Sequence, residues 1–150
     1  MAHVVADRDT TVSPQRVIDA LTDFSPKRLD LWPNLNQQYY ELEESRATSA
    51  EVKEGSSGFG GVWELSRYDW SLPGTVRIDV EDSNAFQPGS YWVYEVTPRP
   101  DGGSHVHMEF DRRPRNAKGH VLSALFRVAG GTIFGKSLGE TLRRIEASPA

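Results

Sequence analysis

NAKGHVLSALFRVAGGTIFGKSLGETLRRIEAS, residues 116–148, decides the fold, because it is the only segment long and apolar enough for a sizeable helix. From Val121 to Ile145 its apolar residues recur at helical rather than alternating intervals. Arg127 and Lys136 cut the apolar run far below the roughly 20 residues that a transmembrane helix needs. The sequence therefore predicts a long carboxy-terminal helix and no stable membrane insertion.

Gly130 and Gly131 lie in the middle of this predicted helix. With about 3.6 residues per turn, the apolar side chains before the pair point one way, and those from Phe134 onward point roughly the opposite way. A straight helix cannot bury both faces against one sheet, and each glycine weakens it by about 1 kcal/mol relative to alanine. We therefore expect a kink, break or twist near Gly130. The half before it, with Leu122 and Phe126, would face another surface and act as a gate for a ligand.

Two short helices are predicted near the amino terminus. Ser13-Pro14 combines a hydroxyl N-cap with a proline at the first helical position, and residues 25–26 repeat this pair. The second helix must stop before Pro33. Residues 4–12, which alternate mildly in polarity, are predicted to form a first strand.

From residue 37 onward the apolar period changes to two, which is typical of strands. Turn residues such as Pro73-Gly74 and Asp101-Gly102 separate the segments. Connections this short join antiparallel neighbours, so the sequence predicts a meander. Its six strands are predicted at residues 38–46, 49–53, 61–70, 75–82, 90–97 and 104–112.

Side-chain parity assigns the faces of the later strands. Trp92 and Tyr94 share the inner face of one strand, and Met108 and Phe110 share that of the next.

The strand at 61–70 leaves its inner face open, because Trp63 and Leu65 share a side with Arg67 and Asp69. Either face would bring an ionisable group into an apolar environment, where burial shifts its pKa. The candidate acid/base groups are therefore Glu64, Arg67, Asp69, Tyr94 and Arg112.

Three short motifs accompany this layout of one strand, two short helices, six strands and a long helix: Ser13-Pro14-x-x-Val17, Leu21-Thr22-Asp23-Phe24 and Trp32-Pro33. Together they resemble the polyketide cyclase/dehydrase and lipid-transport family of the START-like (SRPBCC, Bet v 1-like) superfamily. The resemblance covers nearly the whole chain and implies a single ligand-binding domain over residues 1–150.

The fold that this resemblance implies is the α+β helix-grip fold. In it a curved antiparallel sheet of about seven strands wraps around the long carboxy-terminal helix, with two short helices after the first strand. A cavity between sheet and helix would hold a small, mostly apolar ligand. Combining this with the parity above, we expect the ligand-binding residues to be Trp63, Arg67, Trp92, Tyr94, Met108, Phe110, Phe126 and Phe134.

Composition narrows the function further. Seventeen Lys and Arg against twenty-one Asp and Glu give a net charge of −4, which argues against nonspecific nucleic-acid binding. The chain has no cysteine, so it forms no disulfide and carries no thiolate chemistry. Its first twelve residues lack the basic-then-apolar order of a signal peptide, and a cytoplasmic location is expected.

The glycine-rich stretch 55–61 lacks the Lys-Ser/Thr of a P-loop and lies between strands. We predict a flexible hairpin there, although the stretch is similar in place and composition to the glycine-rich loop that borders the cavity in pathogenesis-related members of the superfamily.

His105, His107, Glu109 and Asp111 share one face of the last strand. Side chains two apart on a strand do not converge on one point, so we predict a solvated outer face and no metal site.

The sequence thus predicts binding of a small hydrophobic or aromatic ligand without a metal or organic cofactor, and transport of that ligand is an open extension of this prediction. The alternative is a cofactor-independent polyketide cyclase or dehydratase that uses general acid/base catalysis. A third reading is a protein–protein interaction module with a vestigial cavity, indicated by the exposed Arg113, Arg115 and Lys118. The identity of the ligand, the presence of catalysis and the oligomeric state stay open.

Overall fold

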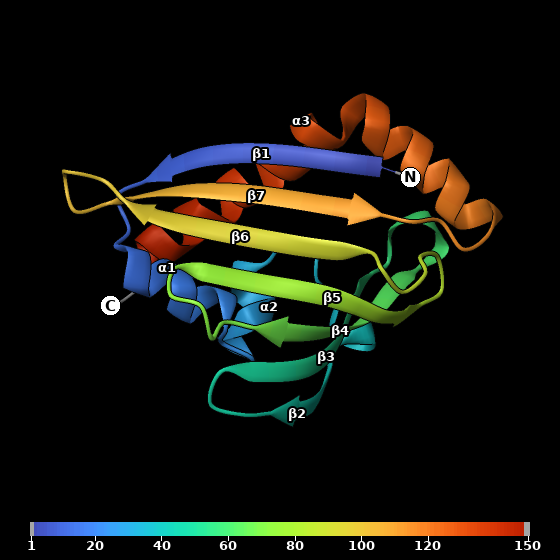
Figure 1. The fold of residues 1–150 in the computed structure, drawn as a ribbon, viewed down its shortest axis with the longest axis horizontal. Coiled ribbons are helices and arrows are strands. Elements are labelled where there is room, and N and C mark those ends of the chain that lie inside the picture. Colours follow the sequence, from blue (N-terminus) through green and yellow to red (C-terminus); the bar gives the residue numbers. More distant parts are fainter. Residues whose placement is uncertain (1, 149–150) are drawn as a thin grey trace.

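A computed structural model describes residues 2–148, apart from the side chain of Phe59. A seven-stranded antiparallel sheet, in the order β1-β7-β6-β5-β4-β3-β2, curves around one long helix (Figure 1). The strands are β1 (Ala2–Thr10), β2 (Glu41–Ser45), β3 (Ser49–Ser56), β4 (Val62–Asp69), β5 (Thr75–Ser83), β6 (Tyr91–Pro98) and β7 (Ser104–Arg112). The helices are α1 (Pro14–Leu21), α2 (Lys27–Leu31) and α3 (Ala117–Ala147), with 3-10 turns at Gln37–Tyr39 and Gly58–Gly60. The predicted helix-grip layout is confirmed.

Strands β2 to β7 form a meander in sequence order. Strand β1 pairs with β7 and forms the edge of the sheet beyond it. Val4 pairs with Phe110 and Ala6 with Met108, so the inner faces of β1 and β7 continue one another. The predicted strand at 38–46 begins later, because residues 37–39 form a 3-10 turn that Asn36 caps. The remaining strands follow the predicted order.

The two Ser-Pro pairs act differently at the starts of α1 and α2. The Ser13 hydroxyl accepts a hydrogen bond from the Arg16 amide, as expected of an N-cap. Helix α2 has Pro26 at its N-cap position and no side-chain cap, and its residue Arg28 is buried. Helix α2 is therefore held in place by the buried Arg28 side chain rather than by a capping hydrogen bond at its first turn.

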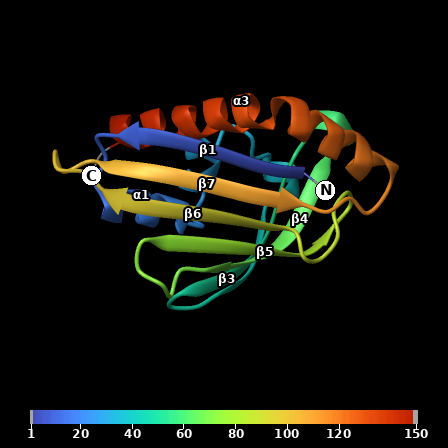
Figure 2. The same ribbon diagram turned by 45° about the horizontal axis from the view of Figure 1, so that its top comes forward.

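Of the kink, break or twist expected near Gly130, the break does not occur, because α3 is one continuous helix, whereas its axis does change direction along its length (Figures 1 and 2). It packs chiefly over β1. The predicted reversal of its apolar face is wrong. Phe126 and Phe134 lie 5.0 Å apart between ring centroids, and both pack edge-on against Phe110 of the inner sheet face.

Small and hydroxyl side chains explain that error. The buried stripe of α3 runs unbroken through Gly119, Ser123, Gly130 and Thr141 as well as through its leucines, whereas Val128 is 90% exposed. A Cβ on Gly130 would lie 2.7 Å from a Val4 methyl carbon. The glycine therefore allows close approach of helix and strand instead of marking a joint. Without that reversal there is no reason to expect the half of α3 before Gly130 to act as a gate for a ligand.

Candidate functional site

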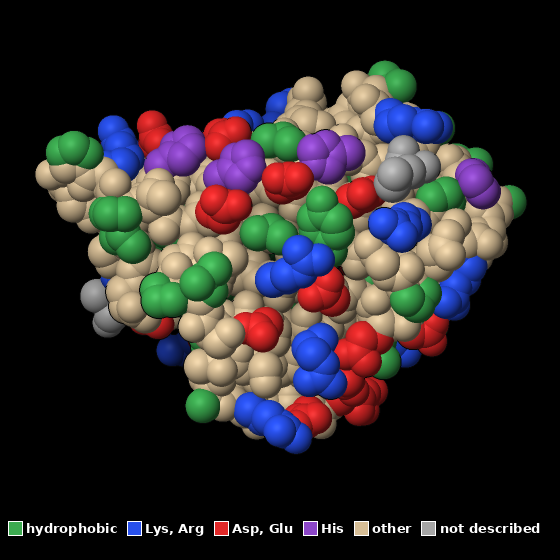
Figure 3. Space-filling view, in the orientation of Figure 1, with side chains coloured by type: hydrophobic (Ala, Val, Ile, Leu, Met, Phe, Trp, Pro, Cys, Tyr) green, Lys and Arg blue, Asp and Glu red, His purple; other side chains and the backbone are tan. Residues whose placement is uncertain are grey.

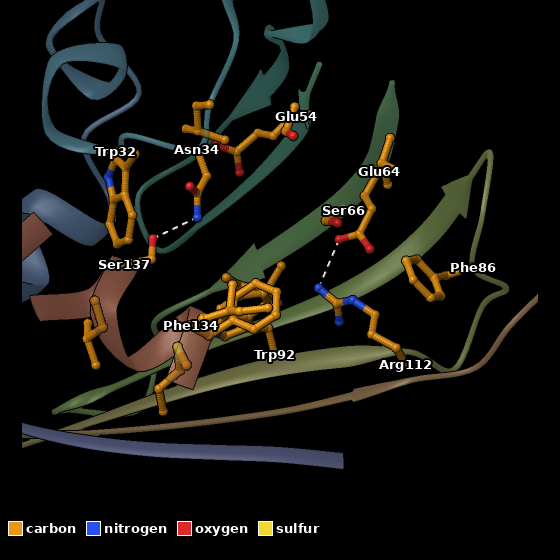
Figure 4. Close-up of a pocket in the computed structure, with 18 of the residues that line it drawn as sticks. Trp32, Asn34, Glu54, Glu64, Ser66, Phe86, Trp92, Arg112, Phe134 and Ser137 are labelled. Carbon is orange, nitrogen blue, oxygen red and sulfur yellow. Dashed lines mark hydrogen bonds and ion pairs between the residues drawn. The ribbon is translucent and has the colours of Figure 1, made fainter. Parts of the chain in front are cut away.

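A cavity of about 390 Å³ lies between the sheet and α3. Its walls come from α2, the middle strands of the sheet and the inner face of α3, with a loop after α2 at one end (Figure 4). Five of the predicted ligand-binding residues line it: Trp92, Tyr94, Met108, Phe126 and Phe134. The inner-face aromatic residues Trp92 and Tyr94 therefore line this cavity together with Phe126 and Phe134 of α3.

One wall is a cluster of packed aromatic rings. Trp92 stacks on Phe110 at 4.5 Å between centroids, and the edge of Phe134 meets Trp92 at 5.5 Å. Phe110 is fully buried behind these rings and supports the wall without lining the cavity. Such contacts hold the rings in fixed orientations, so this wall offers a preformed apolar surface.

An ion pair between Arg112 and Glu64 lies beside this aromatic wall. An Arg112 nitrogen lies 3.0 Å from a Glu64 carboxylate oxygen, and Arg112 also donates to the Tyr91 carbonyl at 3.0 Å (Figure 4). The guanidinium lies about 5 Å from the ring centroids of Trp92 and Phe110. Burial raises the pKa of Glu64, and Arg112 offsets part of that rise.

A second polar group, built around Arg28, borders the same cavity. Arg28 donates to Glu54 at 2.7 Å, to the Tyr68 hydroxyl at 2.8 Å and to the Leu21 carbonyl at 3.0 Å. The Tyr68 hydroxyl in turn donates to Glu54. Burial raises the pKa of Tyr68, so this hydroxyl stays protonated near neutral pH. The three side chains form a closed network that ties α2 to β3 and β4.

Trp63 and Arg67 are not cavity residues, and the prediction that they bind ligand from the inner face is wrong. Both lie on the outer face of β4, where the Lys53 ammonium covers the Trp63 ring at 4.5 Å and Arg67 pairs with Glu51. Side-chain parity could not identify the inner face of β4, because the inner face also carries both polar and apolar side chains. That inner set is Val62, Glu64, Ser66 and Tyr68. Of the acid/base candidates, Asp69 also lies outside and accepts hydrogen bonds from Ser71.

Sequence reasoning missed Arg28, Glu54 and the cavity-closing contact between Asn34 and Ser137. The Asn34 amide donates to the Ser137 hydroxyl at 2.7 Å, and this bond joins the loop after α2 to α3 (Figure 4). Nothing in the local pattern of α2 distinguishes Arg28 from a surface arginine. Asn34 is exposed and Ser137 half-buried, so polarity alone did not mark either of them as a cavity residue.

The glycine-rich stretch borders the cavity through Gly55 and Ser56. A Cβ on Gly55 would lie 2.4 Å from the Val62 carbonyl oxygen, and Gly61 has a φ of 92°. Glycine is therefore required here by close packing and by backbone conformation. The Lys118 ammonium donates to the Gly61 carbonyl at 2.8 Å, which joins the first turn of α3 to this stretch.

The histidines predicted on a solvated face form a ladder across β1 and β7. His105 lies 2.7 Å from Asp9 and 2.9 Å from Asp7, and His107 lies 2.8 Å from Asp7. Figure 3 shows histidine and acidic side chains gathered on the surface over β1 and β7. Hydrogen bonds that the histidine rings donate to the carboxylates raise the pKa of both histidines and lower that of Asp7. Within residues 2–148 no group of three such side chains is arranged to hold a metal ion.

Comparison with known proteins supports this fold. The sequence model of a family described as polyketide cyclase / dehydrase and lipid transport matches residues 1–148. No curated protein matches the sequence significantly. The structure is similar to that of the protein TTHA0849 from Thermus thermophilus, with a TM-score of 0.80 and 14% identity over 99% of both chains.

Two further solved structures have the same fold. The Zhui aromatase/cyclase from Streptomyces sp. R1128 has a TM-score of 0.74 at 16% identity, covering 95% of this chain and 94% of its own. A START superfamily protein from Mycobacterium smegmatis has a TM-score of 0.66 at 10% identity, covering 98% and 93%. At these identities the likeness concerns the fold alone.

Proposed function

The chain belongs to the polyketide cyclase / dehydrase and lipid transport family, and from this premise we propose that it binds a small aromatic or apolar ligand in the cavity between sheet and α3. The observation that carries the proposal is the combination of a rigid aromatic wall with the Arg112–Glu64 ion pair beside it. Trp92 and Phe134 supply apolar surface, and Arg112 supplies donors next to it. Ligand sites have this composition, because apolar burial gives affinity and few polar groups give orientation.

The size of the cavity suits a ligand of one to three rings. Burial of its apolar surface contributes about 25 cal/mol per Å². The guanidinium nitrogens of Arg112 lie beside the aromatic wall as hydrogen-bond donors, and Glu64 neutralises the charge of Arg112. A ligand carbonyl or hydroxyl group placed there accepts a hydrogen bond without leaving a buried charge unpaired.

Native mass spectrometry of the purified protein tests this proposal. We expect a fraction of the protein to carry a noncovalent small molecule that is released on denaturation. Its mass and absorption spectrum identify the ligand class, and an aromatic or apolar compound is the expected result. A protein that stays free of adducts and also binds no apolar aromatic probe, such as 1-anilinonaphthalene-8-sulfonate, would contradict the proposal.

A second candidate function is cyclisation or dehydration of a polyketide-like substrate. The observation that favours it is the raised pKa of Glu64, a carboxyl group that faces the cavity. A carboxyl with a raised pKa keeps its proton at higher pH and can serve as a general acid. An aromatase/cyclase also has this fold. In this reading Glu64 moves the proton, and Arg112 stabilises the oxygen on which negative charge develops.

Glu64→Gln tests the catalytic reading with a poly-β-ketone thioester analogue as substrate. We expect turnover to fall about 100-fold while affinity for the analogue changes little. Because the acid form is the active one, the wild-type rate should fall as the pH rises through the raised pKa of Glu64. Glu54→Gln changes the other cavity carboxylate and is the matched control. Equal turnover of the Glu64→Gln and wild-type proteins would leave ligand binding as the function.

A further inference from the structure

The outer face of the amino-terminal half of α3 carries an apolar stripe with no partner among the described residues. Ala117, Val121, Ala124 and Val128 recur at steps of four and three, and all are exposed. Val121 is 66% exposed and Val128 is 90% exposed, and with the two alanines they form a contiguous apolar stripe rather than scattered single residues. This face is separate from the buried stripe that contacts the sheet.

The same part of the chain is strongly basic. Residues 113–139 contain five Lys and Arg and neither Asp nor Glu, although the whole chain has a net charge of −4. Arg115 pairs with Asp82 at 2.8 Å, whereas Arg113, Arg127 and Lys136 are exposed and make no ion pair within residues 2–148. Basic side chains are visible over this part of α3 in Figure 3. The positive charge is thus concentrated beside the exposed valines.

The geometry of the helix places cations on both sides of the stripe. With about 3.6 residues per turn, Lys118 flanks Val121 on one side, and His120 and Arg127 flank Val128 on the other. A helix with an exposed apolar face edged by cations is the pattern that lies in the interface of an anionic bilayer. A second copy of this chain fits less well, because a two-fold contact would set equal positive charges against each other.

From these observations we propose that this surface, the α3 docking face (Ala117, Val121, Ala124, Val128 with Arg113, Lys118 and Arg127), binds reversibly to the surface of anionic lipid bilayers. The valines enter the headgroup boundary while the cations meet the lipid phosphates. The opposite side of the same helical segment supplies Leu122 and Phe126 to the cavity wall. Docking therefore brings the cavity next to the bilayer.

Flotation with vesicles tests the α3 docking face. Phosphatidylcholine vesicles with about a third phosphatidylserine should bind the wild-type protein, and phosphatidylcholine alone should bind it at least tenfold less. Added salt should release the protein, because it screens exposed charges. Val128→Asp and the double variant Arg113→Glu/Arg127→Glu should each weaken binding about tenfold or more, because the first removes apolar contact and the second removes electrostatic attraction to the lipid phosphates.

Matched controls lie on other surfaces. Leu72 is 65% exposed in the β4–β5 turn, almost as exposed as Val121, and Lys27 is an exposed cation at the start of α2. Leu72→Asp and Lys27→Glu should leave vesicle binding unchanged. Equal binding of wild type and Val128→Asp would overturn the proposal. So would a lipid-free dimer, seen by light scattering, that Val128→Asp dissociates. Binding of 1-anilinonaphthalene-8-sulfonate in solution is measured separately, so failure of vesicle docking is distinguishable from failure of the cavity to bind a ligand.

Discussion

Replacing Arg28 by methionine is expected to lower the free energy of unfolding by about 3–5 kcal/mol. Arg28 is 3% exposed and holds Glu54, the Tyr68 hydroxyl and the Leu21 carbonyl together. Methionine fills a similar volume but donates no hydrogen bond, so Glu54 would keep a charge that is largely shielded from water. Removing one partner of a buried pair costs much more than the pair itself contributes. Urea denaturation followed by tryptophan fluorescence measures the loss.

The pair between Arg143 and Glu140 is the matched control for Arg28. Its two charged atoms also lie 2.7 Å apart, but the Arg143 side chain is 67% exposed. Arg143→Met should therefore cost less than about 1 kcal/mol. The double variant Arg28→Met/Glu54→Gln should recover part of the lost stability, because it removes the unpaired charge as well. Similar losses for Arg28→Met and Arg143→Met would show that the buried network does not fix α2 to the sheet.

The sequence was sufficient for most of the fold because each element carries its own local signal. Period-two alternation and turn residues indicated six of the strands, and Ser13 marked the start of α1 with a cap that the structure confirms. The pairing of β1 with β7 was not predicted by any local pattern. It joins residues about a hundred positions apart, such as Val4 and Phe110.

The errors in the site share a physical cause, which is that apolarity is a poor guide to burial where an element packs closely or lines a cavity. Gly130 and Thr141 are buried because a helix that lies against a strand needs small side chains there. Arg112 and Arg28 are buried because each has a carboxylate partner from a distant part of the chain. Such pairing cannot be read from local sequence, so Arg28 and Glu54 were missed, and Glu64 and Arg112 were predicted only as separate candidates.

Filling the cavity should abolish ligand binding while the fold survives. Ser66 is buried on the inner face of β4 and lines the cavity near Glu64 (Figure 4). In Ser66→Phe the added ring should occupy space that a ligand needs. A phenyl ring excludes on the order of 100 Å² of ligand contact, which at about 25 cal/mol per Å² is about 2.5 kcal/mol, or nearly 100-fold in affinity. Titration with 1-anilinonaphthalene-8-sulfonate measures the effect by fluorescence.

The neighbouring outward position supplies the control for this variant. Leu65→Phe adds a ring to the outer face of the same strand and should bind the probe as the wild type does. Because the probe also binds loosely packed proteins, near-UV circular dichroism must show that both variants keep native tertiary packing. Val128→Asp separates cavity binding from binding at the exposed stripe of α3, and it should leave the affinity unchanged. If Ser66→Phe keeps native packing and the full affinity, the probe binds outside the cavity, and the aromatic wall of Trp92 and Phe134 is then part of the core rather than a ligand site.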